Sequence, residues 1–180
     1  LMSVRLTDGT KQIIIGTRRG VLVRVNEEGI RSMGRTAGGV GGIKLREGDH
    51  VVGMDIIEPG QEILCVTEKG YGKRTPEDEY RLQSRGGVGL KTMQITEKNG
   101  KMCAVKAVDG SEDVMLITIN GMLIRMDVND ISVIGRSTQG VRLIRLADEE
   151  IVATVATVKK DEELSEIDSE LEGNESPTEQ

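Results

Sequence analysis

The sequence predicts an all-β fold built from three tandem repeats, and three observations support this prediction. A strand, a turn glycine and a second strand recur as QIIIGTRRGVLVRV, EILCVTEKGYGKRT and VMLITINGMLIRM. The turn glycines Gly20, Gly70 and Gly121 are 50 and 51 residues apart. Branched aliphatic and polar residues alternate with the period of a half-buried strand, and no helical stripe runs through the repeats. A unit of this length with about four short strands has the size of one propeller blade.

The repeats divide the chain into predicted units. Residues 1–11 end a preceding blade, and blade repeats occupy 12–61, 62–113 and 114–158. In each repeat a further β-rich run follows the hairpin, namely VVGMDII, KMCAVKAV and IVATVATV. Asn120-Gly121 predicts a type I′ hairpin turn, in which both central residues have positive φ.

Charge divides the chain into a basic body and an acidic end. Residues 1–146 carry 22 Lys and Arg against 18 Asp and Glu, whereas residues 147–180 carry 12 acidic side chains and only two lysines. The end is rich in Asp, Glu and Ser, so we expect a disordered acidic tail at 159–180. Competition of the tail with a ligand of the basic body and simple solubilisation are both open alternatives.

The composition excludes several classes of protein. Cys65 and Cys103 lie in apolar runs without metal-ligand spacing, so we expect buried thiols, no disulfide, no metal site and a reducing cytosol. No apolar run approaches the length of a membrane span, and no signal peptide is visible. His50 is the only histidine, and we expect it in an exposed turn. Carboxylate pairs such as Glu112-Asp113 are expected in solvated loops, so no catalytic constellation is predicted.

An arginine follows each turn glycine by fifteen residues and opens a glycine-rich stretch: GRTAGGVGGIKL, SRGGVGLKT or GRSTQGVRLIRL. One such loop alone would favour a tight turn with a solvated arginine. Three loops in register predict a curved basic rim that binds the phosphates of bent duplex DNA. The expected contacts on the stretches are Arg35, Lys44, Arg85, Lys91, Arg136, Arg142 and Arg145. Arg18, Arg19, Lys69, Lys73 and Arg74 flank the hairpin turns and could add to the rim.

Two further patterns restrict the ligand. In QSRGGVGLKT the first glycine of a nucleotide-binding P-loop is missing and Leu90 separates Gly89 from Lys91, so nucleotide hydrolysis is not expected. The only aromatic residues are Tyr71 and Tyr80. Because binders of single strands and RNA usually stack bases on aromatic rings, duplex DNA is the expected partner.

The stretch QSRGGVG followed by LKT resembles a degenerate QRRGGKG box of the C-terminal domain of bacterial DNA gyrase A. The likeness extends through VTEKGYGKRTPEDEY and INGMLIRMDVNDISVIGRSTQGVRLIRL, and covers residues 1–158. The residues that match the box are Gln83, Arg85, Gly86, Gly87 and Gly89, whereas Ser84 and Val88 replace two of its positive charges. The resemblance implies a β-pinwheel, with about three four-stranded blades of a larger six-bladed domain present here.

The same resemblance implies a function and partners. The domain would bind and wrap DNA, and so support ATP-dependent negative supercoiling by an intact type II topoisomerase in the cytoplasm, on the chromosome. Its partners would be double-stranded DNA, the rest of the gyrase A protein and the ATPase subunit in an A2B2 heterotetramer. ATP and Mg²⁺ would act elsewhere in that enzyme, since no cofactor site and no catalytic tyrosine are recognised here. The equivalent domain of topoisomerase IV, and a propeller used only for protein interaction, remain alternatives.

Overall fold

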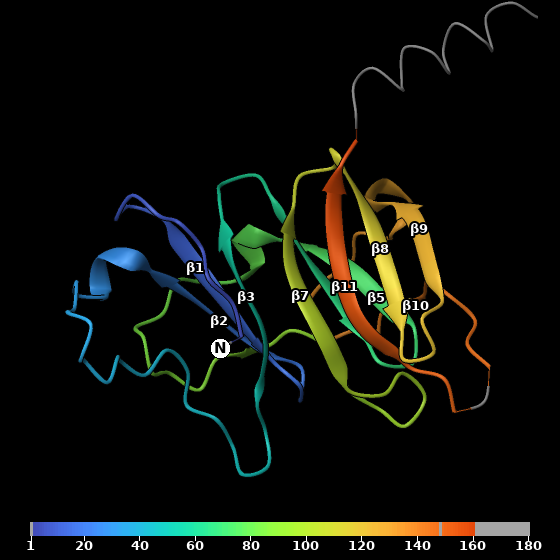
Figure 1. Ribbon diagram of the computed structural model, residues 1–180, viewed down its shortest axis with the longest axis horizontal. Helices are drawn as coiled ribbons and strands as arrows, with labels where there is room; N and C mark the ends of the chain where they lie inside the picture. Colours follow the sequence, from blue (N-terminus) through green and yellow to red (C-terminus); the bar gives the residue numbers. More distant parts are fainter. Residues whose placement is uncertain (1, 148, 161–180) are drawn as a thin grey trace, which may run out of the picture.

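Three antiparallel sheets stand side by side along an arc in the computed structural model, which describes residues 2–147 and 149–160 (Figure 1). The expected disorder at 159–180 falls almost wholly outside the described residues. Residues 2–11 form no strand, but Arg5 pairs with Asp55 and the Ser3 hydroxyl donates to the Met54 carbonyl, so this segment lies along the first sheet. The all-β architecture predicted from the repeats is confirmed.

The first sheet has the order β3-β1-β2-β6, and the second has the order β10-β5-β4-β7. The third sheet has the order β11-β8-β9. The strands of the first two sheets are β1 Gln12–Thr17, β2 Val21–Asn26, β3 Val51–Ile57, β6 Leu90–Lys91, β4 Glu62–Thr67, β5 Tyr71–Pro76, β7 Met102–Val108 and β10 Val141–Arg142. Those of the third are β8 Glu112–Thr118, β9 Leu123–Asp127 and β11 Val152–Lys159. Four strands were expected in each blade, but the described third blade has three.

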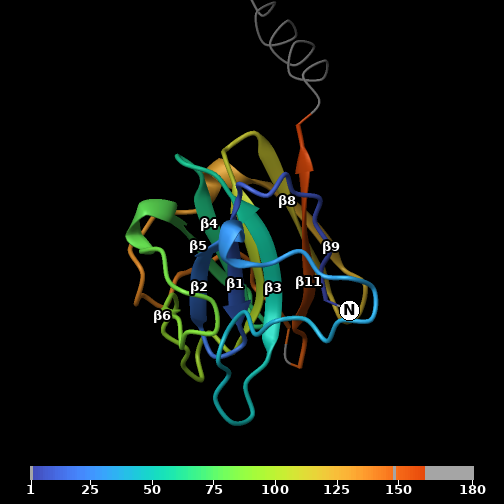
Figure 2. The same ribbon diagram turned by 90° about the vertical axis from the view of Figure 1, so that its left-hand side faces the viewer.

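The outer strand of each complete sheet comes from the following repeat. Leu90 and Lys91 of β6, in the second repeat, pair with Leu22 and Val21 in the first sheet. Val141 and Arg142 of β10, in the third repeat, pair in the same way with β5. Figure 2 shows β6 on the outer side of β2. Sequence repeats and sheets are therefore offset by one strand, and this exchange joins consecutive blades.

The hairpins have a different turn from the one expected. In each, the glycine amide donates to the carbonyl of a threonine three residues earlier, at Thr17, Thr67 and Thr118. Only the glycines, with φ near +80°, have positive φ, and Asn120 does not. A type I turn followed by a glycine in the left-handed region explains this geometry better than the type I′ turn.

Two apolar cores lie between the blades. The core between the first and second blades contains Ile14, Leu22, Ile57 and Ile63, together with the fully buried Tyr80. The core between the second and third is made from Leu64, Val66, Val114, Leu116, Val128, Ile131 and Val155. Each blade thus buries its faces on its neighbours, as stacked repeats do.

Three short 3-10 helices follow the outer hairpin strands: η1 Glu27–Gly29, η2 Glu77–Glu79 and η3 Val128–Asp130. They turn the chain towards the preceding blade. In the first two repeats, the arginine four residues after the turn glycine binds the 3-10 helix of the next repeat. Arg24 donates to the carbonyls of Glu77 and Tyr80, and Arg74 donates to the carbonyls of Asn129 and Ile131. The helix of one repeat is thereby fixed to the sheet of the repeat before it.

Candidate nucleic-acid interface

The exchanged segments are the strands β6 and β10, each of which completes the sheet of the preceding repeat. They carry cations at matching places on consecutive blades. Lys91 lies opposite Val21, and Arg142 lies opposite Tyr71. The glycine two residues earlier makes each crossing possible. A Cβ on Gly89 or Gly140 would lie 2.8 Å from a carbonyl oxygen of the neighbouring strand, and both glycines have φ near +75°. Gly89 therefore has a structural role, because it lets β6 approach the backbone of β2 closely.

The middle loop presents its arginine to solvent. Arg85 is exposed, and its Nε donates to the Gly29 carbonyl at 3.1 Å. Gln83 is half-buried, and its amide N–H donates to the Arg24 carbonyl on β2. The Gln83 side-chain Nε2 is buried without a partner among the described residues. The stretch that resembles the box thus contains one exposed cation, Arg85. Its loop is attached to β2 at Gln83.

The first and middle loops contact each other through their backbones. The Gly86 amide donates to the Gly42 carbonyl at 2.7 Å, and the Lys44 amide donates to the Gly87 carbonyl at 2.8 Å. The side chains of Arg35, Lys44 and Arg85 are all exposed on this pair of loops. The structure therefore brings together loops that are about 45 residues apart in sequence.

The third loop is supported from beneath by a buried lysine. Lys73 is fully buried, and its Nζ donates to the Gly135 and Arg136 carbonyls at 2.7 and 2.8 Å. Burial lowers the pKa of Lys73 to about 8. The Arg136 guanidinium lies 5.7 Å from the centre of the Tyr80 ring, and its backbone N–H donates to Glu79. Arg136 is consequently half-buried, unlike Arg35 and Arg85.

A cationic cluster surrounds Tyr71 at the junction of the second and third blades. The Arg142 guanidinium donates to the Tyr71 hydroxyl at 3.0 Å, and Arg142 and Lys98 lie 5.6 and 5.8 Å from the ring centre. Arg145 and Lys69 line the adjoining cavity of about 510 Å³. Sequence reasoning missed Lys98 because the equivalent turns of the other repeats carry no lysine there.

The cations of the glycine-rich stretches differ from several arginines of the hairpins in their ionic partners. Among the described residues, none of the seven cations predicted on the glycine-rich stretches has a carboxylate within 4.0 Å: Arg35, Lys44, Arg85, Lys91, Arg136, Arg142 and Arg145. Several arginines on the hairpins are paired instead, such as Arg18 with Glu68 at 2.9 Å and Arg74 with Glu62 at 2.5 Å. These seven cations are therefore available to an anionic ligand, together with other exposed cations without a carboxylate partner in the described chain, such as Arg19, Lys69 and Lys98.

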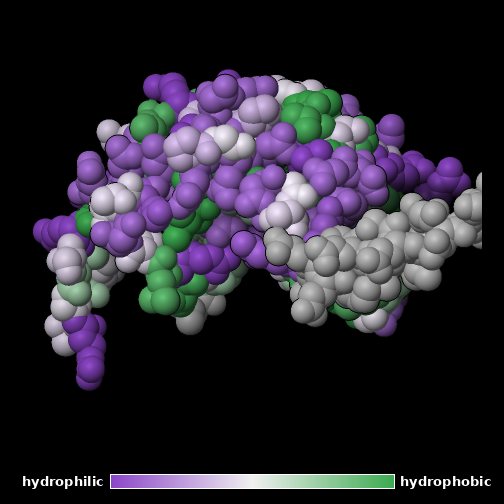
Figure 3. Space-filling view, turned by 90° about the horizontal axis from the view of Figure 1, so that it is seen from above, coloured by the Kyte–Doolittle hydropathy of each residue, from purple (hydrophilic) through white to green (hydrophobic). Residues whose placement is uncertain are grey.

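The five hairpin cations proposed for the rim differ in exposure, and Arg18 is half-buried and paired with Glu68. Lys73 and Arg74 are buried and bind backbone carbonyls of the next repeat, so their expected exposure on the rim is wrong. Arg19 and Lys69 are exposed, as a rim contact requires. Hydrophilic residues cover most of the face seen in Figure 3, whose outline is convex on one side.

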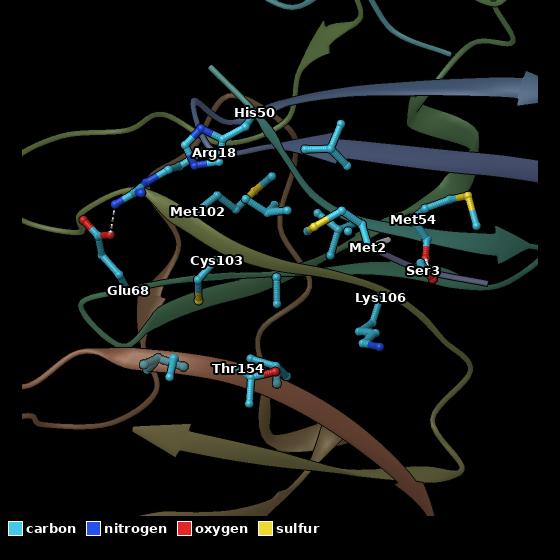
Figure 4. A pocket seen from close by; sticks show the side chains of 18 of the residues that line it. Met2, Ser3, Arg18, His50, Met54, Glu68, Met102, Cys103, Lys106 and Thr154 are labelled. Carbon is cyan, nitrogen blue, oxygen red and sulfur yellow. Dashed lines mark hydrogen bonds and ion pairs between the residues drawn. The ribbon is translucent and has the colours of Figure 1, made fainter. Parts of the chain in front are cut away.

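Figure 4 shows a cavity of about 480 Å³ between the inner strands β3, β7 and β11. Arg18 and Glu68 pair across its edge, and His50 lies nearby in an exposed turn. Burial raises the pKa of the Cys103 thiol to about 12, so Cys103 is a poor nucleophile. No cluster of three potential metal ligands occurs among the described residues.

Two details correct or complete the sequence expectations. Glu112 and Asp113 are buried at the start of β8 rather than solvated in a loop, and Asp113 binds Arg125. Cys65 is fully buried and Cys103 half-buried, and both are free thiols. No helix among the described residues is long and apolar enough to cross a membrane.

Comparisons with known proteins agree with this geometry. The family model "DNA gyrase C-terminal domain, beta-propeller" matches residues 11–58, 61–109 and 112–159. The DNA gyrase A protein of Staphylococcus aureus strain MRSA252 is 52% identical over 182 residues, which cover 100% of this chain and 20% of that protein. The protein of strain NCTC 8325 is 54% identical over 165 residues, 91% of this chain and 19% of the relative. The chain therefore spans about one fifth of these relatives.

Solved structures share the fold. A C-terminal domain of DNA topoisomerase IV aligns with a TM-score of 0.84 and 23% identity, covering 97% of this chain and 55% of that domain. A DNA gyrase A C-terminal domain aligns with a TM-score of 0.78 and 24% identity, covering 84% and 52%. At these identities the likeness shows the fold alone. The three matched repeats decide the family: the chain belongs to the DNA gyrase C-terminal domain, beta-propeller, family.

Proposed function

We propose that this domain binds duplex DNA through its phosphates and bends it along the exchanged segments. The observation that carries the proposal is that Lys91 and Arg142 lie at matching places on consecutive blades and have no carboxylate partner among the described residues. Each such cation that neutralises a phosphate releases condensed counterions, which supplies affinity without reading sequence. Bending costs on the order of 1–6 kcal/mol, and added contacts along the arc would offset it.

Two properties of the surface support duplex DNA as the ligand. Tyr71 and Tyr80 have exposed fractions of 7% and 0%, and they are the only aromatic residues of the chain. Neither ring is available as a stacking platform for unpaired bases. The cluster around Tyr71 instead presents Lys98, Arg142 and Arg145, which suit a phosphodiester backbone.

DNA binding at several salt concentrations tests the proposal. Arg85→Ala should weaken binding to all duplex sequences alike and reduce the slope of log K against log salt by about 0.9. Lys11→Ala is the matched control, because Lys11 carries the same charge but is paired with Glu58 at 2.6 Å. An unchanged slope for Arg85→Ala and for Lys91→Ala would contradict the proposal.

The wider role follows from the family. We infer that the domain wraps DNA for ATP-dependent negative supercoiling by a complete gyrase in the cytoplasm. Duplex DNA, the rest of the gyrase A protein and the ATPase subunit of an A2B2 enzyme would be its partners, and ATP and Mg²⁺ would act in other domains. Identities of 52–54% to gyrase A proteins favour gyrase over topoisomerase IV. A purely protein-binding propeller would show no salt-dependent affinity for duplex DNA.

A further inference from the structure

The Tyr71 ring has two cations next to it that come from different parts of the chain. Its hydroxyl accepts from the Nε and from one Nη of Arg142 at 3.3 and 3.0 Å. The Arg142 guanidinium and the Lys98 Nζ lie 5.6 and 5.8 Å from the centre of the ring. Tyr71 itself is 7% exposed, whereas Lys98 and Arg142 are exposed. A buried ring therefore supports two solvent-exposed cations.

The turn that carries Lys98 is attached to the residues that lead into β10, the strand of Arg142. Asn99 is fully buried, and its Nδ2 donates to the Gln139 carbonyl at 3.0 Å and to the Gln94 carbonyl at 2.8 Å. Gln139 lies two residues before β10 begins. The backbone of the fold therefore holds Lys98 next to β10, so its place does not depend on its long side chain alone.

An open groove of about 580 Å³ lies over this cluster. Its lining residues are Tyr71, Lys98, Gly140, Val141, Arg142, Leu143, Ile144 and Arg145. None of these described lining residues is acidic. The adjoining cavity of about 510 Å³ differs, because Glu149 and Glu150 line it beside Lys69. An anion is therefore expected in the groove and not in the adjoining cavity.

Arg142 retains donors for such an anion. A guanidinium has five N–H donors in a planar fork. Two donors of Arg142 are directed at the Tyr71 hydroxyl, and the others can bind phosphate oxygens, for which arginine is commonly bidentate. Because Tyr71 already orients the guanidinium, a bound phosphate has to immobilise less of the side chain than it would for a free arginine.

The junction of the first and second blades lacks this arrangement. Lys91 has the place of Arg142, but its cross-strand partner is Val21, which has neither a ring nor a hydroxyl. Gln94 has the place of Arg145, since each lies three residues further along the chain. Both of these matched positions are cationic at the junction of the second and third blades, whereas only one is cationic here. The two junctions therefore differ in charge and in how their cations are supported.

Building on the DNA binding proposed above, we propose that the junction of the second and third blades holds a phosphate of duplex DNA in a preformed clamp. Lys98, Arg142 and Arg145 form the clamp, and Tyr71 is its positioning residue, because it orients Arg142. This junction binds the duplex more tightly than the junction of the first and second blades does. Bent DNA is thus fixed at the clamp and contacts the first junction more weakly.

Binding of a duplex of mixed sequence to this chain at several salt concentrations tests the clamp. Arg142→Ala should raise the dissociation constant by at least about threefold more than Lys91→Ala, because only Arg142 offers an oriented fork. Lys98→Ala should reduce the slope of log K against log salt by about 0.9. Lys101→Ala is the matched control, because Lys101 is an exposed lysine three residues further along that does not line the groove. It should leave affinity and slope nearly unchanged.

Tyr71→Phe separates positioning from charge, because it removes the hydroxyl and keeps the ring. It should raise the dissociation constant about threefold in the otherwise natural chain, since one oriented donor pair is lost. In a chain that carries Arg142→Ala it should have no further effect, because the hydroxyl acts through that guanidinium. A merely structural role of the hydroxyl would lower the melting temperature on both backgrounds and leave DNA affinity unchanged.

The outcomes separate the clamp from DNA binding itself. No salt-dependent affinity of the natural chain for duplex DNA would overturn the proposed function together with the clamp. DNA binding by the natural chain, with equal losses for Arg142→Ala and Lys91→Ala, would overturn the clamp alone. Additive effects of Tyr71→Phe and Arg142→Ala would overturn the positioning role of Tyr71.

Discussion

The strands β5 and β9 occupy the same place in consecutive repeats but have opposite environments. From Tyr71 to Thr75 every residue of β5 is buried, whereas no residue from Leu123 to Asp127 is buried on β9. Their own sequences do not cause this difference, because β5 contains Lys73 and Arg74 while β9 contains Leu123 and Ile124. The outer strand of a blade is buried by the repeat that follows it. Burial in this fold is therefore decided between repeats.

The largest effect is expected from truncating equivalent leucines. Leu22→Ala should destabilise the protein by about 3–4 kcal/mol, because it opens a cavity beneath β6 in a fully packed core. Leu123→Ala should cost less than about 1 kcal/mol, because that side chain is half exposed. Urea unfolding measures both values. Equal costs would show that the Leu123 side chain is as well covered as that of Leu22.

The second contrast is between equivalent arginines. Arg74→Ala should cost about 3 kcal/mol, because it leaves Glu62 and the carbonyls of Asn129 and Ile131 without their donor. Arg125→Ala should cost less, because the Arg125 side chain is 56% exposed and Asp113 is its only ionic partner among the described residues. Thermal unfolding at neutral pH compares the two variants. A cost for Arg125→Ala as large as that for Arg74→Ala would show that Arg125 also makes an inter-repeat contact.

The smallest effect concerns the buried lysine of the second blade. The pKa of Lys73 is lowered to about 8 in the folded state, so the unfolded chain binds more protons between pH 8 and 10.5. Stability should therefore rise with pH across this window. Lys73→Met should remove this rise, and comparison with it isolates Lys73 from other groups. A pH profile identical in both proteins would show that Lys73 does not titrate there.

Much of the fold was predictable because it follows from local patterns. The repeat spacing, the strand alternation and the turn glycines predicted an all-β chain of blades, and the structure confirms it. The turn type was not predictable, since Asn120-Gly121 fits two turns and the hydrogen bond from Gly121 to Thr118 selects one. Nor was the strand exchange predictable: the outer strands of the first two sheets come from the following repeat, and the described part of the third blade has three strands.

The candidate interface was predictable in its loops but not in its individual charges. Arg85 is exposed on the middle loop, and Lys91 and Arg142 are exposed on β6 and β10, where the repeat register placed them. Lys73 also lies beside a turn glycine, yet it is buried and supports the Arg136 loop. Lys98 has no counterpart in the other repeats, and only the fold brings it to Tyr71. Sequence cannot separate a structural cation from a free one when both lie near the same turn.

The sequence by itself determined the repeating unit, because alternation and turn glycines act over a few residues. It also determined the cations of the glycine-rich stretches, since these recur in register. Only the tertiary structure decided which strand covers which sheet, because the exchange pairs residues about 70 positions apart, as Val21 with Lys91. The same exchange decides which arginines are used within the fold and which remain for a ligand, since an inter-blade contact exists only where the next repeat is present.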